Sequence, residues 1–222
     1  MTDDKKLHFH FDFLSPFGYL ASLRIDELTR KYQWECEWHP MLLGVTVLKI
    51  MGLPPIAELP LKGPYIRKDA ERYMRRHNIV LGRALGSPQI NPLLPARVVC
   101  WLKHGDPSLA HRLAKDLYHA HWMLDQDISQ IDVLTSILDK HGTNLKEVLK
   151  ALDNGDASKA LRDEVDESVA HGVFGSPTFR VGEELFFGLE KLEVVDDWLR
   201  LGGWGQFHWA QHQLIFCKFR GR

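Results

Sequence analysis

The sequence has few cysteines, and none stands in a pair that thiol chemistry would use. Cys36, Cys100 and Cys217 are the only three among 222 residues, and they are widely separated. An odd number without a Cys-x-x-Cys pair argues against a disulfide framework, a zinc site built on paired cysteines and a dithiol redox centre. We expect each cysteine to be a small buried apolar residue.

An excess of charge and a long apolar run are also lacking. Lys and Arg total 28 against 29 for Asp and Glu, a formal net charge of -1, so nothing electrostatic indicates nucleic acid or an anionic membrane as a partner. No stretch approaches the ~18 apolar residues that a membrane span requires. Residues 1–6 lack the basic and apolar pattern of a signal peptide. These features lead us to expect a cytoplasmic globular protein.

The first forty residues predict a β-α-β unit. Apolar residues alternate with His8, His10 and Asp12 over residues 7–13, which is typical of a strand. From Ser15-Pro16 to Tyr32 the apolar residues recur at helical spacing, and alternation returns at residues 34–38. Two parallel strands joined by one helix therefore open the fold.

The middle of the sequence favours helices, and its end favours a hairpin and one more helix. Four prolines make residues 44–64 mostly loop. Two short strands precede the closing helix, and Gly182-Glu183-Glu184 suits the turn between them. The remaining periodic segments predict helices near residues 66–74, 98–102, 109–123, 133–138, 145–152 and 192–199, and strands at 178–181 and 185–187.

The turn around Ser15-Pro16 can start a helix, carry chemistry, or do both. Serine is a preferred N-cap and proline suits the first helical position. A helix N-terminus also presents free N–H groups and a positive dipole end that stabilise a thiolate placed there. Lowering a thiol pKa by about two units takes roughly 2.7 kcal/mol. One charge-assisted hydrogen bond from the Ser15 hydroxyl and a helix terminus can supply that amount.

A second Ser-Pro pair, Ser176-Pro177, stands just before the predicted hairpin. An X-Pro bond in the cis form costs only ~0.5–1 kcal/mol, and here it would let the Ser176 backbone face a ligand. An ordinary trans bond is the commoner alternative.

Three segments together resemble a known family. Residues 11–21 (FDFLSPFGYLA), 172–179 (GVFGSPTF) and 186–188 (FFG) are similar, in order and spacing, to 2-hydroxychromene-2-carboxylate isomerases and kappa-class glutathione transferases. The resemblance implies an α/β thioredoxin fold with a large all-helical insertion, as in DsbA-like proteins, and a homodimer. The thioredoxin-like domain would comprise residues 7–50 and 160–201 and the insertion residues 60–159, with a tail at 202–222 that has no assigned role.

The resemblance also implies roles for particular residues. Ser15 matches the catalytic serine that hydrogen-bonds the sulfur of glutathione, the implied cofactor. Ser176 matches the residue before a cis-proline, Pro177, whose backbone pairs with the cysteinyl unit of glutathione. Lys62 and Asn91 match a glutathione-contacting lysine and an asparagine of the active-site cleft.

Two departures from the family pattern concern the binding of glutathione. At the γ-glutamyl end, Glu190 and Lys191 keep the family's charges, whereas Leu189 replaces a polar residue. Leu53 stands where an asparagine is expected. Two polar contacts worth ~1 kcal/mol each are thus absent, which predicts weaker or altered binding of glutathione.

The function that follows is a glutathione-dependent isomerisation of an aromatic carboxylate. The thiolate held by Ser15 would add to a conjugated double bond, rotation would follow, and elimination would return glutathione. Lys62 or Lys49 is a candidate partner for the substrate carboxylate. The alternatives are a kappa-like transferase and a non-catalytic ligand binder; a dithiol oxidoreductase is disfavoured, because Ser15 and Gly18 occupy both sulfur positions.

Histidine pairs and a segment near the predicted helical insertion are expected to play structural roles. The pairs His119/His121 and His208/His212 lack the pattern of a metal site, and no metal is predicted. Trp122, Asp127 and Ile128 resemble a family segment in which packing is the expected role.

Overall fold

We describe the fold from a computed structural model, which defines residues 5–204. Cys217, His208, His212 and the rest of the tail after residue 204 lie outside the described residues. Within them, no helix has both the length and the apolar character needed to cross a membrane.

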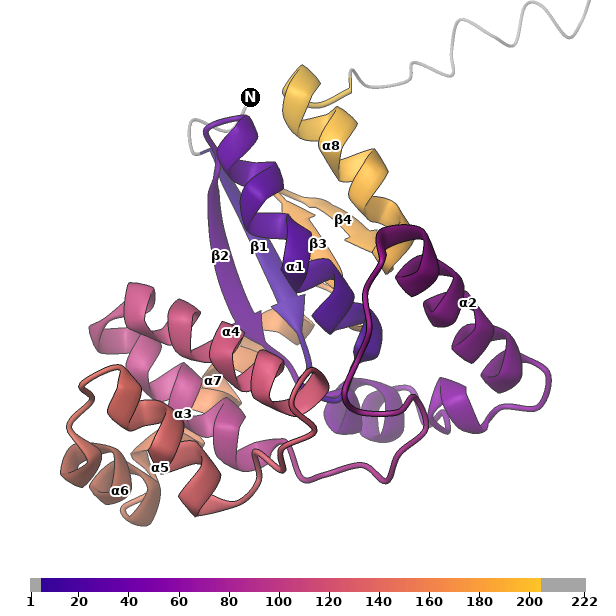
Figure 1. Cartoon of the computed structure of the whole chain (residues 1–222). Helices are drawn as coiled ribbons and strands as arrows, with labels where there is room; N and C mark the ends of the chain where they lie inside the picture. Colours follow the sequence, from indigo (N-terminus) through magenta and orange to yellow (C-terminus); the bar gives the residue numbers. More distant parts are fainter. Residues whose placement is uncertain (1–4, 205–222) are drawn as a thin grey trace, which may run out of the picture.

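A four-stranded sheet forms the centre of the molecule (Figure 1). Its order is β2-β1-β3-β4. Strands β1 (Lys6–Phe11) and β2 (Glu35–Pro40) are parallel and are joined by α1 (Pro16–Lys31), which confirms the β-α-β unit. Strands β3 (Thr178–Val181) and β4 (Glu184–Phe187) form the expected antiparallel hairpin, and β3 also pairs antiparallel with β1.

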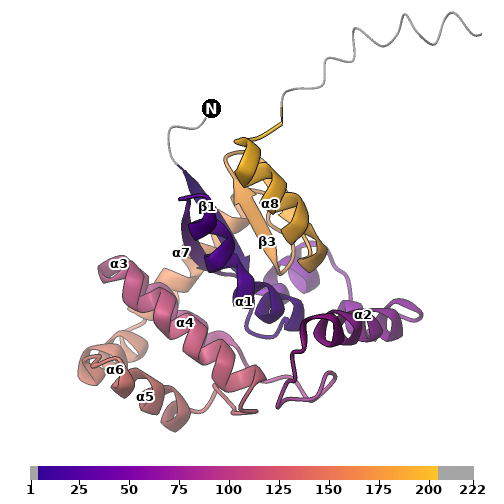
Figure 2. The same ribbon diagram turned by 45° about the horizontal axis from the view of Figure 1, so that its top comes forward.

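Helices cover both faces of the sheet, as Figures 1 and 2 show. Helices α1 and α8 (Leu192–Leu201) lie on one face and α7 (Asp156–Ala170) on the other. On the α1 face Phe9 is fully buried and packs edge-on against Trp38, with 4.9 Å between ring centroids. Burying each such side chain contributes about 1.5–3 kcal/mol, so the apolar half of the strand alternation fixes the register.

The helical segment forms a bundle beside the sheet (Figure 1). Helix α7 packs on α3 and α6 and also on β2, so residue 160, the proposed edge of the insertion, falls inside a helix that serves both parts. The bundle is completed by α3 (Leu93–Gly105), α4 (Pro107–Trp122), α5 (Ile131–Lys140) and α6 (Leu145–Asp153).

The segment expected to be mostly loop, residues 44–64, is more ordered than predicted. It contains a π-helix, η1 (Gly44–Ile50), and a 3-10 turn, η2 (Ile56–Glu58), and α2 (Lys62–His77) begins before Pro64. Proline in the first helical turn removes an N–H that has no intrahelical acceptor. Pro64 therefore lies in the first turn of α2 and not in a loop.

The first strand is shorter than the alternation predicted. It ends at Phe11, and the Ser15 backbone N–H donates to the Asp12 carbonyl at 2.9 Å, which closes a turn over residues 12–15. This turn delivers Ser15 to the start of α1.

Candidate active site

Ser15 is the N-cap of α1 and links two distant segments. Its Oγ accepts a hydrogen bond from the Gly18 N–H at 3.0 Å and its hydroxyl donates to the Ser176 carbonyl at 2.9 Å. The residue is only 5% exposed. The capping interpretation is confirmed, and the same hydroxyl lies at the positive end of the helix.

Ser176 and Pro177 lie beside Ser15, and the bond between them is cis, as the resemblance implied. The Ser176 Oγ accepts from the Asp12 N–H at 3.0 Å. The Gly188 N–H donates to the Pro177 carbonyl at 3.0 Å, which brings the segment of Glu190 and Lys191 to the same end of the sheet.

Gly18 leaves no room for a second sulfur. A Cβ at this position would stand 2.5 Å from the Tyr118 Oη and 2.7 Å from the Ser176 Oγ, distances that real Cβ atoms do not show. A cysteine here therefore requires both Tyr118 and Ser176 to move. The packing, and not only the residue type, opposes a dithiol centre.

The buried carboxylate of Asp12 supports the turn through hydrogen bonds to the backbone. Asp12 is 1% exposed and accepts hydrogen bonds from the N–H groups of Leu14 at 2.9 Å and Leu43 at 2.7 Å. Burial raises the pKa of Asp12 to about 6, and the two backbone hydrogen bonds oppose that rise. The Tyr118 hydroxyl donates to the Asp12 carbonyl at 2.7 Å, and burial also raises the pKa of Tyr118.

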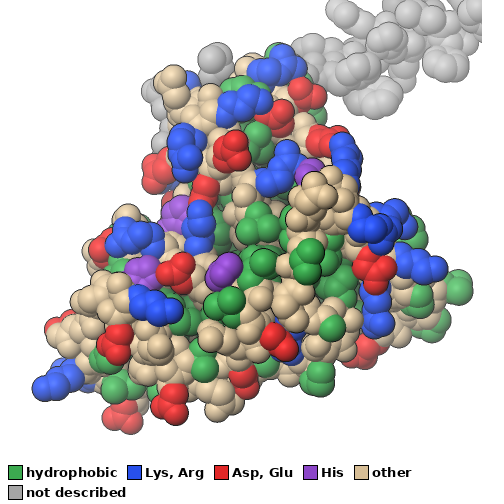
Figure 3. Space-filling model, viewed as in Figure 1, with side chains coloured by type: hydrophobic (Ala, Val, Ile, Leu, Met, Phe, Trp, Pro, Cys, Tyr) green, Lys and Arg blue, Asp and Glu red, His purple; other side chains and the backbone are tan. Residues whose placement is uncertain are grey.

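A cavity of about 120 Å³ opens next to the Ser15 turn. Leu14 and Phe17 line it on either side of Ser15, whose own hydroxyl is engaged with Gly18 and Ser176. Further walls come from Ile66 and Trp122. Hydrophobic side chains gather in the middle of the face drawn in Figure 3, with Lys and Arg along its edge over α2. Apolar side chains thus form much of the cavity wall.

Two arginines line this cavity, and they differ in their partners. Arg83 pairs with Asp125 at 2.7 Å and donates to the Pro88 carbonyl. Arg67 packs against Gly86, whose φ of +92° and lack of a side chain make room for the guanidinium. Within residues 5–204 no carboxylate lies in ion-pair distance of Arg67. Arg67 therefore has a guanidinium group at the cavity with which a bound anion can pair.

The other residues expected at the site are less closely grouped. Among the described residues no hydrogen bond or ion pair joins Lys62 or Asn91 to Ser15; Lys62 is exposed, and the Asn91 Oδ1 accepts from the Leu93 N–H at 3.0 Å. Leu189 is 4% exposed in the core, which leaves only its backbone for a ligand, and Leu53 is exposed.

Several residues of the site carried little or no signal in the sequence. Asp12 was visible only as a polar member of the strand alternation, and Tyr118 and Arg67 lie on helices far along the chain. Trp122, expected to be a packing residue, does pack: its Nε1 donates to the Phe13 carbonyl at 3.0 Å. It also lines the cavity, as does the buried His121.

Replacing Gly18 by alanine should destabilise the protein by about 1–3 kcal/mol, because its Cβ would overlap Tyr118 and Ser176. Urea unfolding of the variant measures this loss. Gly105→Ala is the matched control, since nothing lies within 4 Å of its Cβ position. Equal stabilities of the two variants would contradict the packing described around Gly18.

Asp12 should make stability depend on pH. Its folded pKa, about 6, lies above the ordinary aspartate value of 3.8, so its stabilising contribution is present below pH ~4 and is lost as the pH rises through about 6. The unfolding free energy of the wild type minus that of Asp12→Asn should thus fall by about 1–3 kcal/mol between pH 4 and pH 7. Urea unfolding across that range tests this. A difference that stays constant would show that folding leaves the pKa of Asp12 unchanged, and one that grows with pH would show that folding lowers it. Either result contradicts the account.

Known proteins are similar to this chain over most of its length. Residues 6–200 match the DSBA-like thioredoxin domain model. A 2-hydroxychromene-2-carboxylate isomerase of Pseudomonas putida is 24% identical over 193 residues, 85% of this chain and 91% of that protein. The kappa 2 glutathione S-transferase of Caenorhabditis elegans is 23% identical over 212 residues, 90% and 93% of the two chains.

A solved structure gives the same fold. That of a 2-hydroxychromene-2-carboxylate isomerase superposes with a TM-score of 0.75 at 22% identity and covers 89% of this chain and 96% of its own. The predicted thioredoxin fold with many helices is thereby confirmed. With its family model matched from residue 6 to residue 200, the chain belongs to the DSBA-like thioredoxin domain family.

Proposed function

We propose that this protein is a glutathione-dependent enzyme that isomerises an aromatic carboxylate through a transient glutathione adduct. One observation carries the proposal: the Ser15 hydroxyl stands at the N-terminus of α1 and donates to the Ser176 carbonyl. The relatives named as isomerases and kappa transferases support the reaction class.

Ser15 would act as a hydrogen-bond donor to the glutathione thiolate. Its O–H turns from the Ser176 carbonyl to the sulfur, while its Oγ keeps accepting from the Gly18 N–H. The free N–H groups and the dipole of α1 add further stabilisation of the anion. The thiolate then adds to a conjugated double bond, the resulting single bond rotates, and elimination of the thiolate regenerates glutathione.

Glutathione would lie along the loop of Ser176 and Pro177 and reach the segment that follows β4. The Ser176 backbone would pair with the cysteinyl unit, and Glu190 and Lys191 would meet the γ-glutamyl end. Leu189 would contribute its backbone alone because its side chain is in the core. Lys62 and Asn91 would join from α2 and from the turn before α3.

The substrate would occupy the cavity beside Ser15. Its apolar walls suit an aromatic ring, and Arg67 offers a guanidinium to a carboxylate. The structure favours Arg67 over Lys62 and Lys49 for this contact, because neither lysine lines the cavity.

A kappa-like glutathione transferase is the second candidate. It shares the thiolate and Ser15 but keeps the adduct as product, so net consumption of glutathione identifies it. A non-catalytic binder is the third, favoured by Leu53 and Leu189; glutathione that binds without turnover of any electrophile would identify it.

A homodimer in the cytoplasm completes the proposal. Exposed apolar side chains on and after η1, among them Ile50, Met51 and Leu53, support a partner surface there. The free thiols of Cys36 and Cys100 fit a reducing compartment.

Removing the Ser15 hydroxyl should raise the pKa of the bound glutathione thiol and lower kcat/KM by roughly 10²–10³-fold, as for other single donors to a developing anion. Ultraviolet titration of the thiolate and steady-state kinetics measure the two effects in Ser15→Ala and Ser15→Gly. Glycine retains most of the capping energy, so equal losses in both variants separate catalysis from capping. Ser22→Ala, in the same helix, is the control. Wild-type activity in Ser15→Gly would sink the proposal.

Arg67→Gln should reduce kcat/KM for electrophiles that carry a carboxylate by about 10–100-fold, because a charge-assisted hydrogen bond is lost. Neutral electrophiles of the same shape should be unaffected. Competition kinetics with a matched pair of substrates gives the ratio, and Arg72→Gln, on the same helix but paired with Asp69, serves as control. Equal losses for both substrates would remove Arg67 from substrate selection.

A further inference from the structure

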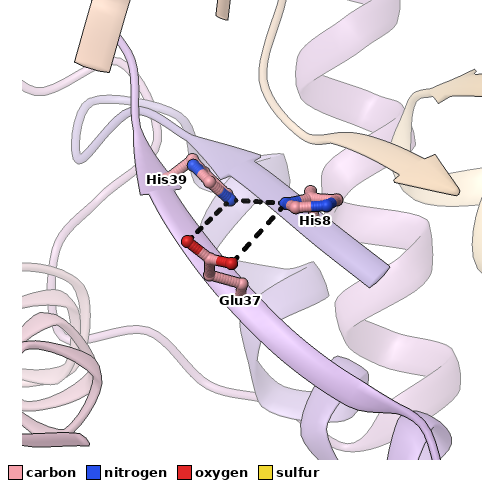
Figure 4. A group of neighbouring side chains, drawn as sticks. All are labelled: His8, Glu37 and His39. Carbon is pink, nitrogen blue, oxygen red and sulfur yellow. Dashed lines mark hydrogen bonds and ion pairs between the residues drawn. The ribbon is translucent and has the colours of Figure 1, made fainter. Parts of the chain in front are cut away.

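A cluster of metal-ligating side chains lies on the sheet face opposite α1. His8 of β1 stands directly across from Glu37 of β2, and His39 follows two residues later on β2. We call these three residues the histidine cluster. Figure 4 shows them pointing toward one another across the two strands. Both strands are held by a parallel ladder of six residue pairs, so the cluster rests on rigid backbone.

The spacing of the cluster fits a small metal ion. The His8 Nδ1 and His39 Nε2 are 2.8 Å apart, the His39 Nε2 and a Glu37 oxygen 3.6 Å, and the His8 Nδ1 and the other Glu37 oxygen 3.9 Å. Ligand atoms held tetrahedrally at about 2.0–2.2 Å from Zn²⁺ lie roughly 3.3–3.6 Å from one another, and the three distances here bracket that range. All three side chains offer ligand atoms within 4.8 Å of one another.

A buried carboxylate already orients one of the ligands. Glu164 of α7 is 7% exposed and hydrogen-bonds the His39 Nδ1. With its proton on Nδ1, His39 keeps a lone pair on Nε2, the atom that faces the His8 Nδ1 at 2.8 Å. A carboxylate behind a histidine is the usual outer support of a metal-binding imidazole.

Solvent reaches two members of the cluster, since the side chains of His8 and Glu37 are 18% and 27% exposed. A cleft of about 410 Å³ follows β2, and Glu37 and Lys103 line it. The neighbouring His10, 2% exposed, stacks on the His39 ring, and its Nε2 has no hydrogen-bond partner among the described residues. The layer therefore contains a buried nitrogen, the His10 Nε2, that can still form a hydrogen bond.

Lysine ammonium groups now neutralise the carboxylates of this layer. The Lys103 Nζ lies 3.0 Å from Glu37 and 2.8 Å from Glu164, and the Lys6 Nζ lies 3.5 Å from Glu37. A divalent ion must compete with these charges. Hard ions that depend on carboxylates alone gain little here, whereas ions that prefer imidazole gain two nitrogen ligands.

We propose that His8, Glu37 and His39 bind one Zn²⁺, with Glu164 orienting His39 and water in the fourth position. The ion would tie β1 to β2 on the sheet face opposite α1, and its binding would raise the free energy of unfolding by RT ln(1 + [Zn²⁺]/Kd). The site does not depend on the proposed use of glutathione.

Calorimetric titration of chelator-treated protein with zinc chloride tests the site. His208, His212 and Cys217 are first replaced by Gln, Gln and Ser, so that the tail offers no competing ligands. We expect one ion per chain with Kd on the order of 1 µM or tighter. His8→Gln and Glu37→Gln should each weaken binding at least tenfold, and the exposed His119→Gln should not. No stoichiometric binding, or binding that survives both substitutions, overturns the proposal.

The Lys103→Gln substitution should change the affinity for zinc in the opposite direction. Removing the competing ammonium should tighten zinc binding by about tenfold or more, which damage to the fold would not do. Co²⁺ in place of Zn²⁺ should give the visible bands of a four-coordinate site, lost in His8→Gln. Weaker zinc binding in Lys103→Gln, or a Co²⁺ spectrum that His8→Gln leaves unchanged, contradicts the placement.

Discussion

The hydroxyl of Ser15 holds together two segments separated by 161 residues. It caps α1 through the Gly18 N–H and binds the carbonyl of Ser176. Gly18 must be a glycine because Tyr118 and Ser176 occupy the space next to it. Asp12, below the turn, receives the Tyr118 hydroxyl on its carbonyl and two backbone N–H groups on its carboxylate. One small polar group thus sets the geometry of the site and, with Gly18, accounts for the lack of a dithiol.

The sheet contributes to three features of the molecule, which lie on its two faces and at the carboxyl end of β1. The apolar residues of β1 face α1 and form the core, the carboxyl end of β1 carries the Ser15 turn, and the polar residues face α7. On that face His10 bonds Ser168 and His39 bonds Glu164, so the layer is polar where a sheet face is usually apolar. Unpaired buried charges are costly, and pairing keeps this layer compatible with a stable fold.

Much of the fold was predictable from sequence because periodicity reports local structure. The β-α-β unit, the hairpin and the helices follow from which residues must be buried, and Ser15-Pro16 marked the start of α1. The start of α2 before Pro64 was missed, because proline gives the same signal in a loop and in a first helical turn. Ser15, Ser176 and Pro177 came from motifs, whereas Tyr118, Arg67 and the histidine cluster depend on tertiary proximity, which periodicity does not report.

The central claim is that the Ser15 hydroxyl donates a hydrogen bond to the thiolate of bound glutathione. A crystal structure of the glutathione complex tests it most directly. The account predicts the sulfur within ~3.5 Å of the Ser15 Oγ and the cysteinyl backbone paired with Ser176. Glutathione bound elsewhere, or a sulfur distant from Ser15 while its hydroxyl stays on the Ser176 carbonyl, would contradict the account.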